Sequence, residues 1–91
     1  MSELTLSHKE WDSLRWQCRR GMLELDGILL PFLEEDLPDL AIGLQHDFVR
    51  LLQASDLELF RWLLRGAAPA DPALVSLLEV IRDCHQARLG R

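Results

Sequence analysis

The residues best suited to chemistry in this sequence gather in one run, Arg19-Arg20-Gly21-Met22-Leu23-Glu24-Leu25-Asp26. The run joins two guanidinium groups, a glycine and two carboxylates, a combination that core packing does not require. Guanidinium groups recognise carboxylates and carbonyls, and a glycine beside them lets another protein's backbone approach closely. The run therefore predicts a protein-docking site. Its predicted partner-binding residues are Arg19, Arg20, Gly21, Glu24, Asp26 and the nearby aromatic Trp16.

The same residues also have an ordinary structural interpretation. Arg20 and Glu24 are four positions apart, so on one continuous helix they would form a surface pair worth roughly 0.2–0.5 kcal/mol. Gly21 would then be only a helix stop, and the flanking charges would be solvated. Trp16 would pack against its own bundle. Both interpretations are open at the level of sequence.

Catalysis has little support in the residue pattern. The chain has no tyrosine, and His8, His46 and His85 stand apart without the spacing of a metal or nucleophile motif. Its five glycines are scattered singly, so no loop is suited to hold a cofactor phosphate. Cys18 and Cys84 are far apart, which argues against zinc and favours free thiols over a disulfide. We expect no catalytic residue, no metal site and no stably bound cofactor.

Length and charge limit the remaining possibilities. The 91 residues, 48% of them apolar, are assigned to a single domain spanning 1–91. A net charge of -5 repels a phosphate backbone, so nucleic acid is not an expected partner. From Glu24 to Glu58 the chain carries nine acids and one base. Within this range, the acidic stretch from Glu34-Glu35-Asp36 through Asp39 supports the rival binding function, an acidic, antitoxin-like regulator, although such a charge run is also typical of a solvated face.

The N-terminus and hydropathy indicate where the chain acts. Met1–Leu4 has neither an apolar signal core nor the composition of a transit peptide. No apolar run reaches membrane-spanning length, so membrane insertion is not expected. We expect a bacterial cytoplasmic protein that is a monomer when unbound, with the mitochondrial matrix as the less favoured location.

Capping signals and apolar spacing predict two helices in the first half. Ser7 and Glu10 form a capping box that opens the first helix, and Gly21 ends it in a left-handed conformation. The second helix is expected to bend between Gly27 and Pro31 and to close at Leu37-Pro38-Asp39, because the residue before a proline avoids helical angles. The predicted core residues here are Trp11, Leu14, Cys18, Met22, Leu25, Leu29, Phe32 and Leu33.

Three further helices are predicted in the second half, so the expected architecture is a compact all-α bundle of about five helices. The third runs over residues 44–53, after an ambiguous stretch at 40–43. Ser55 and Glu58 form the capping box of the fourth, and Asp71-Pro72 opens the fifth. The predicted core residues are Leu44, Phe48, Leu51, Leu52, Leu57, Phe60, Leu63, Leu64, Leu74, Leu77, Leu78, Ile81 and Cys84, with Trp62 favoured as core.

Two regions resemble the FAD assembly factors of succinate dehydrogenase. Arg20, Gly21 and Glu24 match the R-G-x-x-E pattern of that family, and the neighbouring residues of the run extend the match. Residues 51–66 form the second region, with Leu51-Leu52, Asp56-Leu57, Leu59-Phe60, Trp62-Leu63 and Gly66 in the expected order. Arg61 stands where the family pattern has another polar residue, and Gly27 and Pro31 interrupt a helix that is usually more regular.

The resemblance implies an assembly chaperone rather than an enzyme. It would bind the flavoprotein subunit of succinate dehydrogenase, with fumarate reductase as a second candidate client, and promote covalent attachment of FAD. A histidine of the client would perform the chemistry, and the FAD would belong to the client. In this interpretation Arg20 engages a client carboxylate or carbonyl, Glu24 a client cation or amide, and Gly21 permits close approach.

Overall fold

Helices account for about three quarters of the chain that the computed structural model describes, residues 5–90. The prediction made from Met1–Leu4 lies outside these described residues. The five α-helices are α1 His8–Cys18, α2 Leu23–Pro31, α3 Ile42–Leu51, α4 Asp56–Leu64 and α5 Pro72–Leu89, with a π-helix, η1 Phe32–Asp36, and a 3-10 helix, η2 Leu37–Asp39, between α2 and α3. No strand occurs within residues 5–90. The all-α prediction of about five helices is confirmed.

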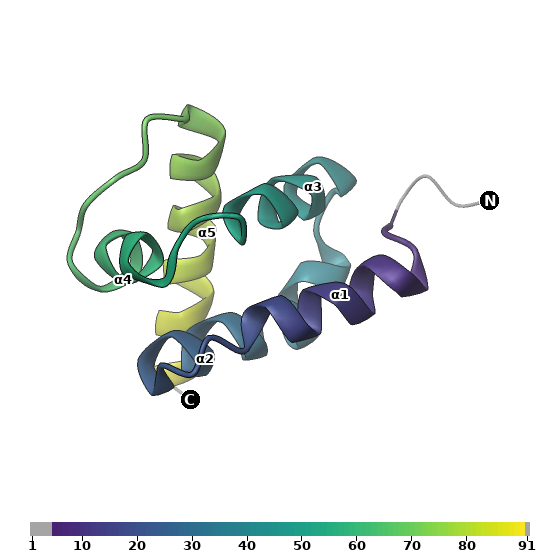
Figure 1. The fold of residues 1–91 in the computed structure, drawn as a ribbon, viewed down its shortest axis with the longest axis horizontal. Coiled ribbons are helices and arrows are strands. Elements are labelled where there is room, and N and C mark those ends of the chain that lie inside the picture. The colour runs from purple at the N-terminus through teal and green to yellow at the C-terminus, as the bar shows by residue number, and fades with distance from the viewer. Residues whose placement is uncertain (1–4, 91) are drawn as a thin grey trace.

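The last helix packs against three of the other four α-helices. Figure 1 shows α5 standing across the directions of α1, α2 and α3, and it contacts α2, α3, α4 and η1. Helices α1 and α2 run side by side and are joined by a short corner. Because α5 touches elements from both halves of the sequence, it closes the bundle into one core.

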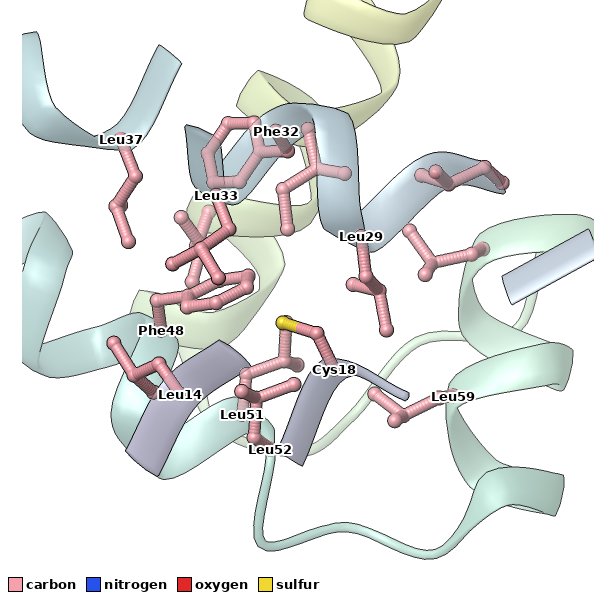
Figure 2. Close-up of a cluster of buried hydrophobic side chains, with 14 of the residues drawn as sticks. Leu14, Cys18, Leu29, Phe32, Leu33, Leu37, Phe48, Leu51, Leu52 and Leu59 are labelled. Atoms are coloured by element: carbon pink, nitrogen blue, oxygen red, sulfur yellow. The ribbon is translucent and has the colours of Figure 1, made fainter. Parts of the chain in front are cut away.

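One apolar cluster forms that core (Figure 2). Cys18 at the end of α1 points into it together with leucines and phenylalanines from the other elements. The rings of Phe32 and Phe48 lie 5.4 Å apart between centroids and are tilted by 44°, a favourable aromatic arrangement. The fully buried large side chains are Leu14, Leu25, Leu29, Phe32, Leu33, Leu37, Phe48, Leu51, Leu59, Leu77, Leu78 and Ile81.

The capping signals in the sequence are confirmed. Ser7 accepts the N–H of Glu10 while Glu10 accepts the N–H of Ser7, and Ser55 and Glu58 form the same reciprocal pair at α4. Asp71 accepts the N–H of Ala73 at 2.9 Å and so caps α5. Each cap satisfies backbone donors that the first turn of a helix leaves free. Local chemistry thus sets where these three helices begin.

Two core predictions for α4 are wrong. Leu57 is 57% exposed and Leu64 is 39% exposed, whereas Leu59, which was not predicted as core, is fully buried. At 3.6 residues per turn, Leu57 lies about 160° round the helix from Leu59, and Leu64 about 100° from Leu63. One helix cannot bury both sides against the same core, and α4 turns its Leu59 and Leu63 side inward.

The irregularity predicted within the second helix occurs later than expected, whereas the segment closes where it was predicted to close. Helix α2 is regular through Pro31, and the change comes at Phe32, where the π-helix begins. Proline removes one N–H from the α-helical pattern, and beyond it the N–H of Leu37 donates to the carbonyl of Phe32, five residues back. Leu37 itself keeps helical angles, φ -59° and ψ -38°, although a proline follows. The helical path ends at Asp39, because Leu40 is extended with φ -89° and ψ 159°, and the predicted close at Leu37-Pro38-Asp39 is confirmed.

Gln45 is a buried polar residue that the sequence pattern did not indicate. Its side chain is fully buried on α3, where its Oε1 accepts the N–H of Leu6 at 3.2 Å. Its Nε2 donates to the carbonyls of Leu37 and Leu40, each at 3.2 Å. One side chain thereby joins the segment before α1, the η2 turn and α3.

Replacing Gln45 tests this junction. Gln45→Ala leaves the N–H of Leu6 and the carbonyl of Leu40 without this partner and adds a small cavity, while the carbonyl of Leu37 keeps the N–H of Leu40. We therefore expect the free energy of unfolding to fall by about 2–4 kcal/mol. Urea unfolding followed by circular dichroism measures the loss. The control is Gln86→Ala, an exposed position on α5, where the change should stay within about 0.5 kcal/mol. Equal losses in the two variants would contradict the assigned role.

Candidate protein-docking site

The predicted docking run forms the corner between α1 and α2, residues 19–22, together with the start of α2. Helix α1 ends at Cys18 and α2 begins at Leu23. Gly21 has φ +78°, a left-handed conformation that glycine adopts at little cost, and a Cβ at this position would meet nothing within 4 Å. The helix is therefore interrupted, and the interpretation that pairs Arg20 with Glu24 on one continuous helix is wrong.

Arg20 turns inward from this corner. Its side chain is 15% exposed. One terminal nitrogen, Nη2, donates to the carbonyl of Leu52 at 2.5 Å. The other, Nη1, donates to the carbonyl of Ala54 at 3.4 Å and pairs with the Asp56 carboxylate at 3.2 Å. The guanidinium thus connects the α1–α2 corner to the loop between α3 and α4.

Asp26 closes the corner from the other side. Its Oδ1 accepts the backbone N–H of Arg20 at 2.8 Å. Met22, the residue before α2, offers no side-chain cap, so the carboxylate of Asp26 instead secures the backbone that enters the helix. Both the backbone and the side chain of Arg20 are held within the chain. Arg20 and Asp26 therefore position the corner, and the charges available to a partner lie elsewhere in the run.

The remaining residues of the run divide between core and surface. Leu25 is fully buried and Met22 is partly buried, whereas the others are exposed, as is the nearby Trp16. Trp16 is 78% exposed and Leu23 is 84% exposed, and Arg19, Gly21 and Glu24 are exposed as well. We call these five residues the corner surface. Two large apolar side chains this accessible, flanked by a cation and a carboxylate, are typical of a protein-binding surface. Four of the predicted site residues, Trp16, Arg19, Gly21 and Glu24, are thus exposed at the corner. The other two, Arg20 and Asp26, form contacts within the chain instead.

Leu23 is the member of the corner surface that the sequence reasoning missed. It occupies a variable position of R-G-x-x-E. Its helical spacing could have identified it, because it does not lie on the side of α2 that buries Leu25, Ile28 and Leu29. On the α1 side of the corner surface, a cleft of about 320 Å³ is lined by Arg15, Trp16 and Arg19. A partner side chain entering there would meet an aromatic wall between two guanidinium groups.

The thiols are poorly suited to nucleophilic chemistry. Burial raises the pKa of Cys18 to about 12, so the thiol stays protonated at neutral pH. Burial also raises the pKa of Cys84.

Within residues 5–90, no group of three or more His, Cys, Asp or Glu side chains is placed to hold a metal ion. None of the helices in this range is both long and apolar enough to cross a membrane.

A model of the family described as flavinator of succinate dehydrogenase matches residues 12–85. The chain belongs to this family. Several proteins are similar in sequence to this chain over most of its length. A protein of Photobacterium profundum is 46% identical over 84 residues, covering 92% of this chain and 96% of the relative. A protein of Mannheimia succiniciproducens is 46% identical over 76 residues, which cover 81% of this chain and 88% of the relative. A protein of a Serratia species is 39% identical over 75 residues, which cover 82% of this chain and 85% of the relative.

All three relatives bear the name FAD assembly factor SdhE. The family resemblance inferred from Arg20, Gly21 and Glu24 is therefore confirmed. In this flavinator-family chain the first residue of the R-G-x-x-E pattern binds inside the protein, and the last faces solvent. The pattern thus combines a residue that shapes the corner with residues that the corner displays.

The inward role of Arg20 predicts a stability effect. Arg20→Ala removes hydrogen bonds to two carbonyls and one carboxylate, so we expect the free energy of unfolding to fall by about 2–3 kcal/mol. Arg20→Lys should recover only part of this loss, because an ammonium cannot reach the separate acceptors as a planar guanidinium does. Urea unfolding measures both variants.

The matched control for these variants is Arg19→Ala, one residue away and exposed. Its change in unfolding free energy should stay within about 0.5 kcal/mol. If Arg19→Ala and Arg20→Ala cost the same, the connection between the corner and the α3–α4 loop does not stabilise the fold.

Proposed function

We propose that this chain binds the flavoprotein subunit of succinate dehydrogenase and promotes covalent attachment of FAD to it. Membership of the flavinator family and the names of its relatives support the activity. The single structural observation that carries the docking mode is the corner surface, where Trp16 and Leu23 are 78% and 84% exposed around a left-handed glycine.

In this proposal the client performs the chemistry and holds the FAD. Both thiols of the helper have raised pKa values, so neither is an effective nucleophile at neutral pH. The helper supplies geometry instead. A preference of about 3 kcal/mol for one arrangement of the client enriches that arrangement more than a hundredfold, which is sufficient to accelerate a step that the client carries out itself.

The residues of the motif divide between two tasks. Arg20 and Asp26 hold the corner in shape. Gly21 lets a client backbone approach, because no side chain occupies the open space around it. Glu24 accepts hydrogen bonds from a client cation or amide. Trp16, Arg19 and Leu23 supply the surrounding apolar and cationic contacts. Direct contact between Arg20 and a client carboxylate stays a prediction, and we assign this residue mainly to positioning.

The proposal also includes location and assembly state. The chain acts in the bacterial cytoplasm, in keeping with the bacterial origin of its relatives, and is a monomer before it meets the client. Membrane insertion and nucleic-acid binding form no part of it. Neither fumarate reductase as a second client nor the antitoxin-like regulator gains support from the names of the relatives, so neither is carried forward.

Coexpression tests the proposed activity. We expect the flavoprotein subunit to carry more covalent flavin when coexpressed with this chain than when expressed alone, because the helper enriches the reactive arrangement. In-gel flavin fluorescence after denaturation measures the covalent product, since flavin that is not covalently bound is lost. Equal fluorescence with and without the chain, at equal amounts of flavoprotein, would sink the proposal.

A substitution at Glu24 tests the corner surface. Glu24→Gln removes an exposed charge without removing a contact inside the chain, so we expect covalent flavin formation to slow about tenfold with unchanged helical content. Glu34→Gln is the matched control, an exposed carboxylate of η1 outside the corner surface, and it should retain the rate of the unmodified chain. The same loss in both variants would mean that overall charge, rather than the corner, governs the effect.

A further inference from the structure

Helix α4 presents a second apolar side to solvent. Leu57 and Leu64 are exposed on it, and Arg61 lies between them, four residues after one and three before the other. Residues at these spacings share one side of a helix. Exposed leucines grouped around an accessible cation are typical of a surface that a binding partner covers.

A hollow adjoins this side of α4. It measures about 300 Å³ and lies between α2, α4 and α5, lined by Ile28, Leu63, Leu64, Arg82, His85 and Gln86. Its apolar part includes Ile28 and Leu63, which are 5% and 7% exposed, and its polar part contains no carboxylate. This combination of an apolar floor with a few polar groups is typical of a binding pocket. Leu64 belongs to both features and joins them into one surface, the α4–α5 face.

The charges of this face point to an acidic occupant. The ion pairs found within residues 5–90 engage Arg15, Arg20, Arg50 and Arg88. In that part of the chain neither Arg61 nor Arg82 forms one, and Arg82 donates instead to the carbonyl of Trp62 at 2.9 Å. The chain carries 15 acidic and 10 basic residues. Among the described residues, Arg61 and Arg82 therefore lack a carboxylate partner even though the chain has more acids than bases. A carboxylate from another molecule would complete them.

The same charges disfavour a second copy of this chain as the occupant. In a two-fold contact each patch faces itself, so Arg61 and Arg82 would approach the same cations of the partner copy. Like charges brought together at an interface cost free energy. The complementary surface must therefore belong to a different protein.

The α4–α5 face is linked to the corner by the ion pair between Arg20 and Asp56. Leu57 directly follows Asp56, the carboxylate that pairs with Arg20. Helix α4 also packs against α2, the helix that begins at the corner, and Figure 1 shows it beside that end of the bundle. A client that binds the corner and extends along α4 would therefore contact both surfaces.

We infer that the α4–α5 face binds an acidic segment of the client flavoprotein that carries an apolar side chain. The apolar side chain enters the hollow beside Leu64, and the carboxylates of the segment pair with Arg61 and Arg82. This inference rests on the proposed function, because it names a second part of the same docking interface. It assigns specificity to residues outside the R-G-x-x-E pattern.

Binding to the purified FAD-free flavoprotein subunit, measured by isothermal titration calorimetry, tests the inference. Arg61→Glu should raise the dissociation constant about tenfold or more and weaken its dependence on salt, because an attractive charge contact is replaced by a repulsive one. The matched control is Lys9→Glu, which changes the net charge equally at the far end of α1 and should bind like the unmodified chain. Circular dichroism confirms that each variant is folded.

Leu57→Gln separates apolar contact from charge. Because Leu57 is 57% exposed, its replacement should leave the fold intact and still weaken binding about tenfold, while the salt dependence stays that of the unmodified chain. Unchanged affinity in Leu57→Gln and Arg61→Glu would overturn the inference. So would an equal loss in Lys9→Glu and Arg61→Glu, because binding would then depend on overall charge.

The flavinylation assay distinguishes this inference from the proposed function. If the unmodified chain raises covalent flavin and Glu24→Gln reduces the gain, while the two α4 variants retain full affinity and activity, only the α4–α5 face is refuted. If the unmodified chain neither binds the flavoprotein nor raises covalent flavin, the proposed function fails and the inference fails with it.

Discussion

The insertion of Arg20 into the α3–α4 loop is the interaction on which the displayed surfaces depend. Its guanidinium satisfies the carbonyls of Leu52 and Ala54 and pairs with Asp56, so one side chain fastens the α1–α2 corner to the start of α4. Carbonyls at the end of a helix and in a following loop need donors, and a planar guanidinium serves several at once. Together with the packing of α4 against α2, this connection fixes the corner relative to α4.

Around that connection the bundle uses polar side chains sparingly. Gln45 is the only polar residue among the buried side chains within residues 5–90, and it joins three segments that do not pack through apolar contacts alone. Arg88 of α5 pairs with Asp36 of η1 and ties the last helix to the π-helix. A domain of this size buries a limited apolar area, so each such connection is a substantial part of its stability.

The proposed helper function needs surfaces rather than catalytic groups. Cys18, the thiol closest to the motif, is fully buried and its pKa is raised to about 12, so it contributes packing. What the fold presents instead are exposed apolar side chains next to charges, at the corner through Trp16 and Leu23 and on α4 through Leu57. Binding energy spent on holding a client in one arrangement is a sufficient source of rate enhancement when the client carries its own reactive groups.

Local signals in the sequence determined the number of helices and several of their ends. The caps at Ser7, Ser55 and Asp71 and the left-handed Gly21 depend only on neighbouring residues, so they were predictable from short motifs. Only the tertiary structure decided what each motif residue does. Arg20 meets acceptors 32 to 36 positions away, Gln45 meets a donor 39 positions away, and the orientation of α4 leaves Leu57 outside the core. Helical spacing identifies which residues share a side of a helix, but which side is buried is settled by the elements that pack against it.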